Sequence, residues 1–413
     1  MTHSEVIVAH PGRQYSYQTA LAMQQAGHLA SYLTGIYYKP DSAFGRVVRL
    51  MGPVEREMRR RYQDGLASEL IRQCPLGELL YLGASRLRPL AKYAPGIVRW
   101  RNDRFDRSVA RIVDREKPAA VVCYDTCAIH TFRKASNLGI LRVLDQSVGH
   151  WRTLAARMQE EAELQPDFAD TLPLNVPEWF LAQCTEEALL ANVILAGSQY
   201  VKDTMVRHGV ESSRVAVIPY GADIDRFRPV RRLHDGCFRV LFVGQLSQRK
   251  GIKYLLDAVA ALRTPGLELL LVGPVVGSGR GLRAYTEHFT HVPGVPHHEV
   301  HLYFQRADIF VHPSLYEGSA IAIYEALASG LPVVTTSDSG SVIRDGIEGF
   351  IVPIRDVEAL MEKILLLYED HELREAMGAN ARKRAEEFTW AAYRRKAGSL
   401  LSDLLQAQEH QAR

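Results

Sequence analysis

Two glycine-bearing stretches decide the fold: VGQLSQRKG at residues 243–251 and HPSLYEGSA at residues 312–320. Each follows a short apolar run, Val240–Val243 in the first case and Ile309–Val311 in the second, and each leads into a segment with helical periodicity. A strand, a glycine turn and a helix, repeated along a chain, predict a parallel sheet that is covered by helices.

The same rhythm runs through the rest of the chain. Further apolar runs lie at Val6–Ala9, Ala119–Cys123, Leu141–Leu144, Val193–Ala196, Val215–Ile218, Leu267–Val272, Val333–Thr335 and Phe350–Val352. Turn-forming and charged residues interrupt the series near 220–236. We therefore predict an α/β protein with two facing, doubly wound (Rossmann-like) parallel-sheet domains, at residues 1–220 and 237–388, joined by a linker at 221–236. A helix in residues 389–413 is expected to cross back to the first domain.

Composition narrows the classes of function. The chain has 413 residues with 50 basic and 47 acidic side chains, a balance that argues against a nucleic-acid binder. Five scattered cysteines make a disulfide framework improbable and favour a reducing, cytoplasmic compartment. Cys123, Cys127 and His130 have no second cluster at zinc spacing, so we expect no metal site. The N-terminal apolar run is too short for a signal peptide, and no run is long enough to span a membrane.

The stretch from Lys39 to Lys117 is the basic part of the chain, with 18 Lys or Arg against 10 Asp or Glu. A solvated helical face is the simpler interpretation. The alternative is a surface that touches anionic lipid or an acidic acceptor, which would place the protein at the inner face of the membrane.

The two glycine stretches also carry chemistry. Glycine lets backbone approach a ligand closely, and a helix start presents N–H groups to an anion. Arg249 and Lys250 add two full positive charges. Glu317 precedes a helix and Glu325 lies about two turns into it, which puts them about 12 Å apart. That distance suits the two ends of an extended ligand, although helix capping or a surface ion pair would also explain two glutamates here.

Four motifs together resemble the retaining glycosyltransferases of family 4, which have the GT-B fold. They are GQLSQRKG, HPSLYEG with Glu325 following in YEALASGLPVV, DGIEGFIV, and VIPYGADIDRF at the link between the domains. The resemblance is strong over residues 190–390 and loose in the first half. It implies that the donor binds the second domain and the acceptor the first.

The resemblance implies a role for each matching residue. Lys250 would hold the donor diphosphate beside the Gly244 turn, Glu317 would face the donor sugar, and Glu325 would bind the ribose hydroxyls. Gln245 stands where the family has an arginine, and we expect Arg249 to compensate partly for that loss. The remaining expected donor contacts are the N–H groups of Ser319, Ala320 and Ile321, Val295 against the nucleobase, Gly12 in the first glycine loop, and His150 beside the sugar. An exposed loop histidine is the alternative for His150.

The function implied is that of a hexosyltransferase. It would move a hexose or deoxyhexose, with retention, from a nucleotide-diphosphate sugar to a glycan, lipid-linked or small-molecule acceptor in polysaccharide biosynthesis. The resemblance implies no cofactor and no essential metal. Two alternatives remain open: a catalytically silent sugar-nucleotide-binding scaffold subunit, and a GT-B epimerase.

Overall fold

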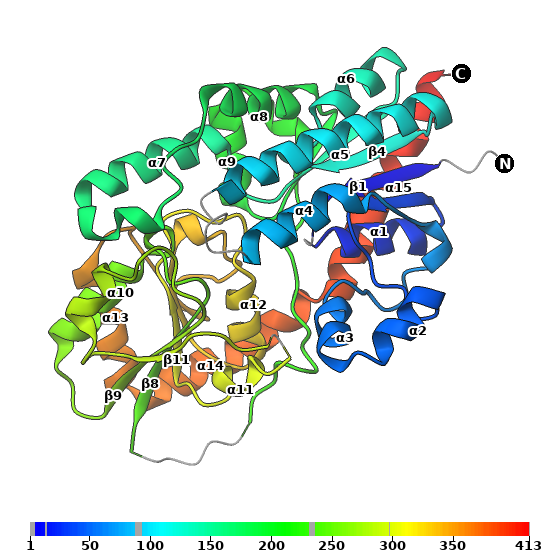
Figure 1. Cartoon of the computed structure of the whole chain (residues 1–413). Coiled ribbons are helices and arrows are strands. Elements are labelled where there is room, and N and C mark those ends of the chain that lie inside the picture. The colour runs from blue at the N-terminus through cyan, green and yellow to red at the C-terminus, as the bar shows by residue number, and fades with distance from the viewer. Residues whose placement is uncertain (1–4, 13–14, 87–92, 231–235, 297, 413) are drawn as a thin grey trace.

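The computed structural model describes residues 5–12, 15–86, 93–230, 236–296 and 298–412, so residues 231–235 of the predicted linker lie outside it. The chain forms two α/β domains, each built on one parallel sheet, as Figure 1 shows. This confirms the predicted fold class.

The first sheet has seven strands in the order β3-β2-β1-β4-β5-β6-β7, and every neighbouring pair is parallel. In chain order the strands are β1 (Val6–His10), β2 (Leu29–Thr34), β3 (Ile71–Gln73), β4 (Ala120–Tyr124), β5 (Leu141–Gln146), β6 (Val193–Ala196) and β7 (Val215–Val217). The helices are α1 (Ser16–Gln25), α2 (Ala43–Arg49), α3 (Gly52–Arg59), α4 (Pro75–Arg86), α5 (Ala94–Glu116), α6 (Ile129–Asn137), α7 (Trp151–Leu164), α8 (Glu178–Leu190) and α9 (Gln199–Arg207).

The second sheet has six parallel strands in the order β10-β9-β8-β11-β12-β13. They are β8 (Phe238–Val243), β9 (Leu267–Val272), β10 (Thr290–Val292), β11 (Ile309–His312), β12 (Val333–Thr336) and β13 (Gly349–Val352). Its helices are α10 (Ile252–Leu262), α11 (His301–Phe304), α12 (Ile321–Ala328), α13 (Val357–Glu369) and α14 (His371–Glu387). Because β8 and β11 are neighbours, the two glycine stretches that follow them leave the same edge of the sheet.

The last helix, α15 (Trp390–Ala412), lies against α1 in the first domain, as the red helix in Figure 1 shows. Arg394 donates to Gln18 and Gln25, and Ser402 bonds to His28. The final segment of the chain therefore packs on the first domain, although it follows the second.

A second segment crosses between the domains in the opposite direction, from the first domain onto the second. Residues 151–172, which we call the strap, comprise α7 and a 3-10 turn at Pro166–Thr171. In Figure 1 α7 extends over the second domain, above α10. Buried apolar side chains of the strap belong to the same cluster as those of β8 and α10: Leu154, Met158, Phe168 and Leu172. Although it falls within residues 1–220, the strap completes the core of the second domain.

Among the residues described, no helix combines the length and the apolar character that crossing a membrane requires.

Candidate functional site

The two glycine stretches meet at the carboxyl ends of β8 and β11. Gly251 has φ +70°, and a Cβ at this position would overlap the carbonyl oxygen of Pro313, so a side chain is excluded on both grounds. The carbonyl of Arg249 accepts from the N–H of Leu315 at 3.0 Å and from the hydroxyl of Ser314 at 3.2 Å. These contacts hold the first turn against the second.

Arg249, Lys250 and Glu317 form one ion cluster. Nη1 of Arg249 lies 3.0 and 3.1 Å from the two carboxylate oxygens of Glu317, and Nζ of Lys250 pairs with Oε2. Burial alone would raise the pKa of Glu317, but Lys250 and Arg249 outweigh it and lower the pKa to about 2. Burial lowers the pKa of Lys250, and Glu317 opposes that shift. Two cations thus face one carboxylate, which leaves a local excess of positive charge.

The start of α12 lies directly after Glu317. The Ala320 N–H already donates to the carbonyl of Ser339 at 3.2 Å, whereas the N–H groups of Ser319 and Ile321 have no acceptor among the described residues. The hydroxyl of Ser319 bonds to the hydroxyl of Tyr324 at 2.7 Å. Glu325 lies on α12 and is 6% exposed. The structure therefore brings Lys250, Arg249 and Glu317 together, and Glu317 directly precedes the helix that carries Glu325.

This cluster touches the first domain. A Cβ on Gly318 would overlap the carbonyl oxygen of Ser147, which follows β5. Ser198 donates its hydroxyl to the carbonyl of Gly318, and Tyr316 donates to the carbonyl of His150 at 2.9 Å. Backbone-to-backbone approach of this kind requires glycine at residue 318. The cluster accordingly sits where the two domains meet.

His150 contributes to this junction through its backbone. Its ring is buried, stacks on His208 with centroids 4.0 Å apart, and accepts at Nδ1 from the N–H of Arg152. Burial, with nearby His208 and Arg152, lowers the pKa of the imidazole to about 3, so the ring is neutral at ordinary pH. The ring contacts Thr185 of α8 and His208 directly after α9, and no contact among the described residues joins it to Lys250 or Glu317.

The other predicted donor residues occupy separate positions. Gly244 has φ +149° and donates its N–H to the carbonyl of Val272 at 2.9 Å. Gln245 beside it is exposed, and Val295 is half-buried beyond β10. Gly12 follows β1, where a Cβ would lie 3.5 Å from the guanidinium of Arg101. Within the described ranges, no contact joins Gly12 to the ion cluster.

Gly12 lies near a cavity of about 220 Å³ at the carboxyl ends of the first sheet's strands. Its polar lining includes Glu78, Arg101 and Arg104. Glu78 is buried and accepts from Arg61 at 2.8 Å and from Arg101 at 2.6 Å.

Two polar groups at the domain junction did not emerge from the sequence. Asp125, directly after β4, is buried and accepts from the hydroxyl of Ser147 and from Nε1 of Trp151 at 3.0 Å. Burial raises its pKa. Its position after a predicted strand was the signal that could have found it. Arg157 of the strap donates to Asp338 at 2.8 Å and to the carbonyl of Leu315 at 3.2 Å; nothing local in the sequence marks it.

Comparison with known proteins shows that part of the chain is similar to glycosyltransferases. Residues 223–384 match the family model described as Glycosyl transferases group 1, a span that contains Lys250, Glu317 and Glu325. A D-inositol 3-phosphate glycosyltransferase of Paenarthrobacter aurescens (strain TC1) is 30% identical over 219 residues, which cover 48% of this chain and 54% of that protein. A putative colanic acid biosynthesis glycosyltransferase, WcaL, of Salmonella typhimurium is 30% identical over 217 residues, which cover 48% of this chain and 53% of that protein. The chain thus spans about half the length of the curated relatives it matches.

Solved structures are similar over nearly the whole chain. Sucrose-phosphate synthase from Thermosynechococcus elongatus has a TM-score of 0.66 at 20% identity, covering 98% of this chain and all of that one. Anabaena HepE, solved with UDP and glucose, has a TM-score of 0.62 at 16% identity, covering 97% of this chain and all of that one. The fold is therefore GT-B.

Proposed function

We propose that the protein is a retaining glycosyltransferase that moves a hexose or deoxyhexose from a nucleotide-diphosphate sugar. The observation that carries the proposal is the ion cluster of Arg249, Lys250 and Glu317 at the start of α12, where the domains meet. A diphosphate placed there would meet two cations and the helix N-terminus. The match to group 1 glycosyl transferases supports the activity, and the UDP complex of Anabaena HepE supports the donor class.

Chemically, the demanding step is loss of the nucleoside diphosphate while the sugar carbon becomes oxocarbenium-like. Lys250 and Arg249 would stabilise the charge that grows on the leaving phosphate, and fixed donors of this kind typically supply about 3–4 kcal/mol each. The same cations would do this without a metal. Since Glu317 is bound to both of them, we assign it to orienting the donor sugar rather than to nucleophilic attack. Glu325 would bind the ribose and Val295 the base.

A thermal-shift screen with UDP, GDP, ADP and dTDP, followed by turnover assays with the matching sugars, tests the proposal. We expect one nucleotide to stabilise the protein and product to keep the donor's anomeric configuration. A covalent sugar trapped on Glu317, or inverted product, would overturn the retaining mechanism assigned here. A GT-B epimerase would instead convert the sugar without an acceptor, and a silent scaffold subunit would bind the nucleotide without turnover.

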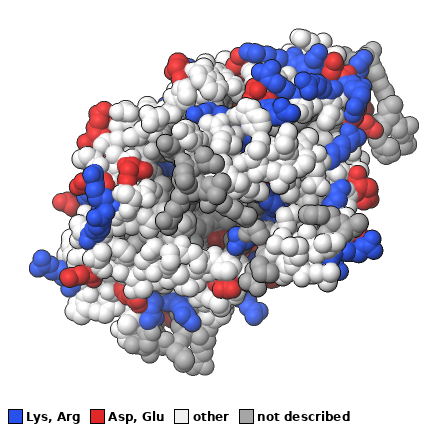
Figure 2. Space-filling view, viewed as in Figure 1, with Lys and Arg blue, Asp and Glu red and all other residues white. Residues whose placement is uncertain are grey.

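For the acceptor we propose a lipid-linked molecule at an anionic membrane surface. In the basic region 39–117, of which residues 87–92 lie outside the description, α2 and α3 meet at a corner with exposed apolar side chains: Val47, Leu50, Met51 and Val54. Leu50 is 87% exposed, and Arg46 and Arg49 flank it in the last turn of α2. Figure 2 shows further Lys and Arg side chains gathered over α5 and α6. Apolar groups beside cations are typical of an interfacial lipid contact.

Vesicle flotation tests this contact. We expect the protein to float with vesicles that contain anionic lipid at low salt, and to lose binding in a Leu50→Glu/Met51→Glu variant. Leu189→Glu is the matched control, since Leu189 is 47% exposed on α8. Absence of wild-type binding at low salt would remove the membrane proposal while leaving the donor chemistry intact.

A further inference from the structure

Glu161 of the strap is a fully buried carboxylate whose described partners all come from the second domain. Its Oε1 accepts from Nε2 of Gln248 at 2.7 Å and from the hydroxyl of Tyr254 at 2.7 Å. Its Oε2 accepts from Nε of Arg355 at 2.8 Å. A carboxylate removed from water is costly unless it is fully paired, and this one is paired across the domain boundary.

Gln248 transmits that contact to the ion cluster. It is buried and begins the 3-10 turn Gln248–Lys250, two residues before Lys250. Its Oε1 accepts from the N–H of Lys253 at 3.0 Å, and its own N–H donates to the hydroxyl of Thr171 in the strap at 2.9 Å. The backbone N–H and the side-chain amide of Gln248 are thus both hydrogen-bonded. They fix the orientation of the turn that carries Arg249 and Lys250.

We propose that Glu161 is a positioning residue for the donor site, acting through Gln248 on the turn that carries Arg249 and Lys250. This inference rests on the proposed function. Arg249 and Lys250 are adjacent like charges that repel each other, so their electrostatic energy falls when they move apart. A rigid turn keeps them converged on Glu317 and on the donor diphosphate. The effect of Glu161 is therefore expected on donor binding and on turnover, and not on acceptor binding.

The strap supplies a matched control in the neighbouring residue. Glu160 pairs with the same arginine, Arg355, at 2.8 and 2.9 Å, but its side chain is 55% exposed and has no contact with Gln248 in the described part of the chain. Glu160→Gln and Glu161→Gln each remove one negative charge that pairs with Arg355. Only Glu161→Gln changes the support of the cation turn.

The experiment measures the Kd of whichever of UDP, GDP, ADP and dTDP binds the wild type, with donor KM, acceptor KM, kcat and Tm. For Glu161→Gln we expect the nucleotide Kd and donor KM to rise about tenfold, as for one weakened charge-assisted hydrogen bond. Acceptor KM should stay within about twofold, as should every constant of Glu160→Gln. Gln248→Ala should reproduce the effect, and Glu161→Gln/Gln248→Ala should be no worse than the worse single variant, because the two residues act in series.

Three outcomes would overturn the inference. One is a Glu161→Gln variant with the same donor constants as Glu160→Gln. Another is an equal rise in donor KM and acceptor KM together with a lower Tm, which would indicate a purely structural role. The third is additive effects of Glu161 and Gln248. A wild type that binds none of the four nucleotides would overturn the proposed function instead, and the two failures are therefore distinguishable.

Discussion

Lys250 and Glu317 show how the same residues can be predicted separately and found together. The resemblance assigned one to the phosphates and the other to the sugar, and the structure pairs them directly. Glu317 pairs with both cations of the cluster. A diphosphate that binds as we propose would therefore compete with this carboxylate for Lys250 and Arg249.

Removing Lys250 should cost turnover more than it costs stability. We expect Lys250→Ala to lower kcat by about a hundredfold or more, because a fixed donor to the leaving phosphate is lost. Lys253→Ala is the control, since the Lys253 side chain pairs with Asp257 instead. Steady-state kinetics with saturating donor measures the effect. Equal kcat values for the two variants would contradict the role of Lys250.

We expect the loss of Arg249 to have a smaller effect than the loss of Lys250, and to change the donor Kd rather than kcat. Arg249→Ala removes one of the two cations that pair with Glu317, and its guanidinium also holds the carbonyl of Tyr316 at 2.8 Å. We expect donor Kd to rise about tenfold, the value of one charge-assisted hydrogen bond. Calorimetric titration with the bound nucleotide measures it. Unchanged affinity and turnover would show that Arg249 does not substitute for the arginine replaced by Gln245.

Glu317→Gln should separate binding from chemistry. Without the competing carboxylate, we expect the nucleoside diphosphate to bind at least as tightly as it does to the wild type. The sugar would lose its orienting group, so kcat should fall by about tenfold or more. Titration calorimetry and turnover assays on one preparation give both numbers. Weaker nucleotide binding in this variant would mean that Glu317 organises the cations rather than competing for them.

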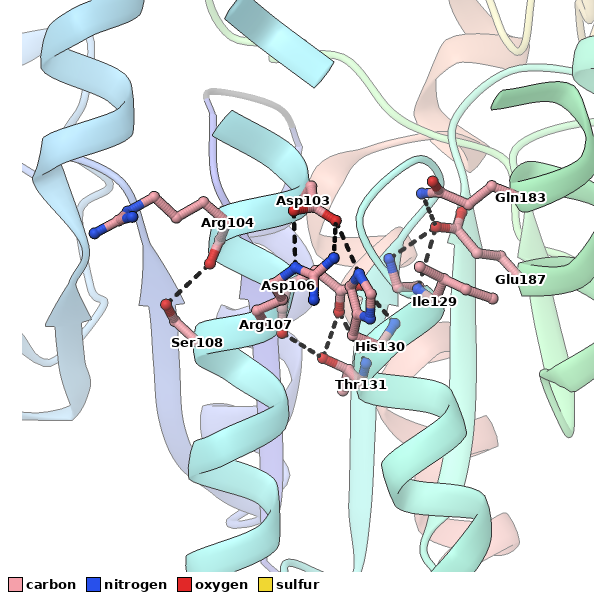
Figure 3. Close-up of polar contacts among 11 residues, drawn as sticks. Asp103, Arg104, Asp106, Arg107, Ser108, Ile129, His130, Thr131, Gln183 and Glu187 are labelled. Atoms are coloured by element: carbon pink, nitrogen blue, oxygen red, sulfur yellow. Dashed lines mark hydrogen bonds and ion pairs between the residues drawn. The ribbon is translucent and has the colours of Figure 1, made fainter. Parts of the chain in front are cut away.

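At the scale of elements, the start of α6 is a second helix start whose first turn bonds to charged side chains. Figure 3 shows Asp106 of α5 and Glu187 of α8 pointing at the first turn of α6. Asp106 accepts from the N–H groups of His130 and Thr131 at 2.7 and 3.0 Å, and Glu187 from that of Ile129 at 3.2 Å. These two carboxylates serve the fold.

The α6 start gives a stability prediction. Asp106→Asn places an amide N–H₂ against a backbone N–H, and we expect the free energy of unfolding to fall by about 1–3 kcal/mol. Asp103→Asn is the control, because Asp103 is 43% exposed and should change stability by no more than about 1 kcal/mol. Urea unfolding measures both. Equal effects would mean that burial of Asp106 adds nothing.

Apolar runs were enough to predict most strands and both sheets, but β2 and one edge strand of each sheet, β3 and β10, were missed. β3 and β10 have three residues each, most of them polar, whereas the predicted edge strand β7 also has three residues but is wholly apolar. The cation turn and Glu317 were found because glycine and charge mark them in the sequence. The strap was not, since the pattern of α7 is helical whichever domain it packs on. Contacts such as Glu161 with Gln248, 87 residues apart, have no local signal.

At the scale of the whole molecule, a buried carboxylate lies where α15 returns to the first domain. Thr19 of α1 bonds to Tyr124 of β4 and Tyr393 of α15, both at 2.9 Å, and donates to Asp145 of β5 at 3.3 Å. Burial raises the pKa of Asp145 to about 7. The docking of the last helix is thereby linked to a proton.

The effect of this group on the pH dependence of stability has a definite sign. Between the unfolded pKa near 3.9 and the folded value of about 7, the folded protein binds more protons at this group, so its contribution to stability falls as pH rises. We expect Asp145→Asn to flatten this decline between about pH 4 and 7. Urea unfolding at several pH values measures the slope. An unchanged slope in the variant would assign the decline to other buried groups.

The strap and α15 have a consequence for synthesis of the chain. The first domain emerges from the ribosome early but lacks α15, which packs on α1, until the second domain has also been synthesised. At that stage the second sheet has not been synthesised. The apolar side chains of the strap that pack against it therefore lack their partners: Leu154, Met158, Phe168 and Leu172. The strap belongs to the first domain but packs in the core of the second, and α15 follows the second domain but packs on the first. We therefore expect neither domain to complete its folding independently on the nascent chain. Exchange of a whole domain with a related protein would therefore disrupt both packings at once.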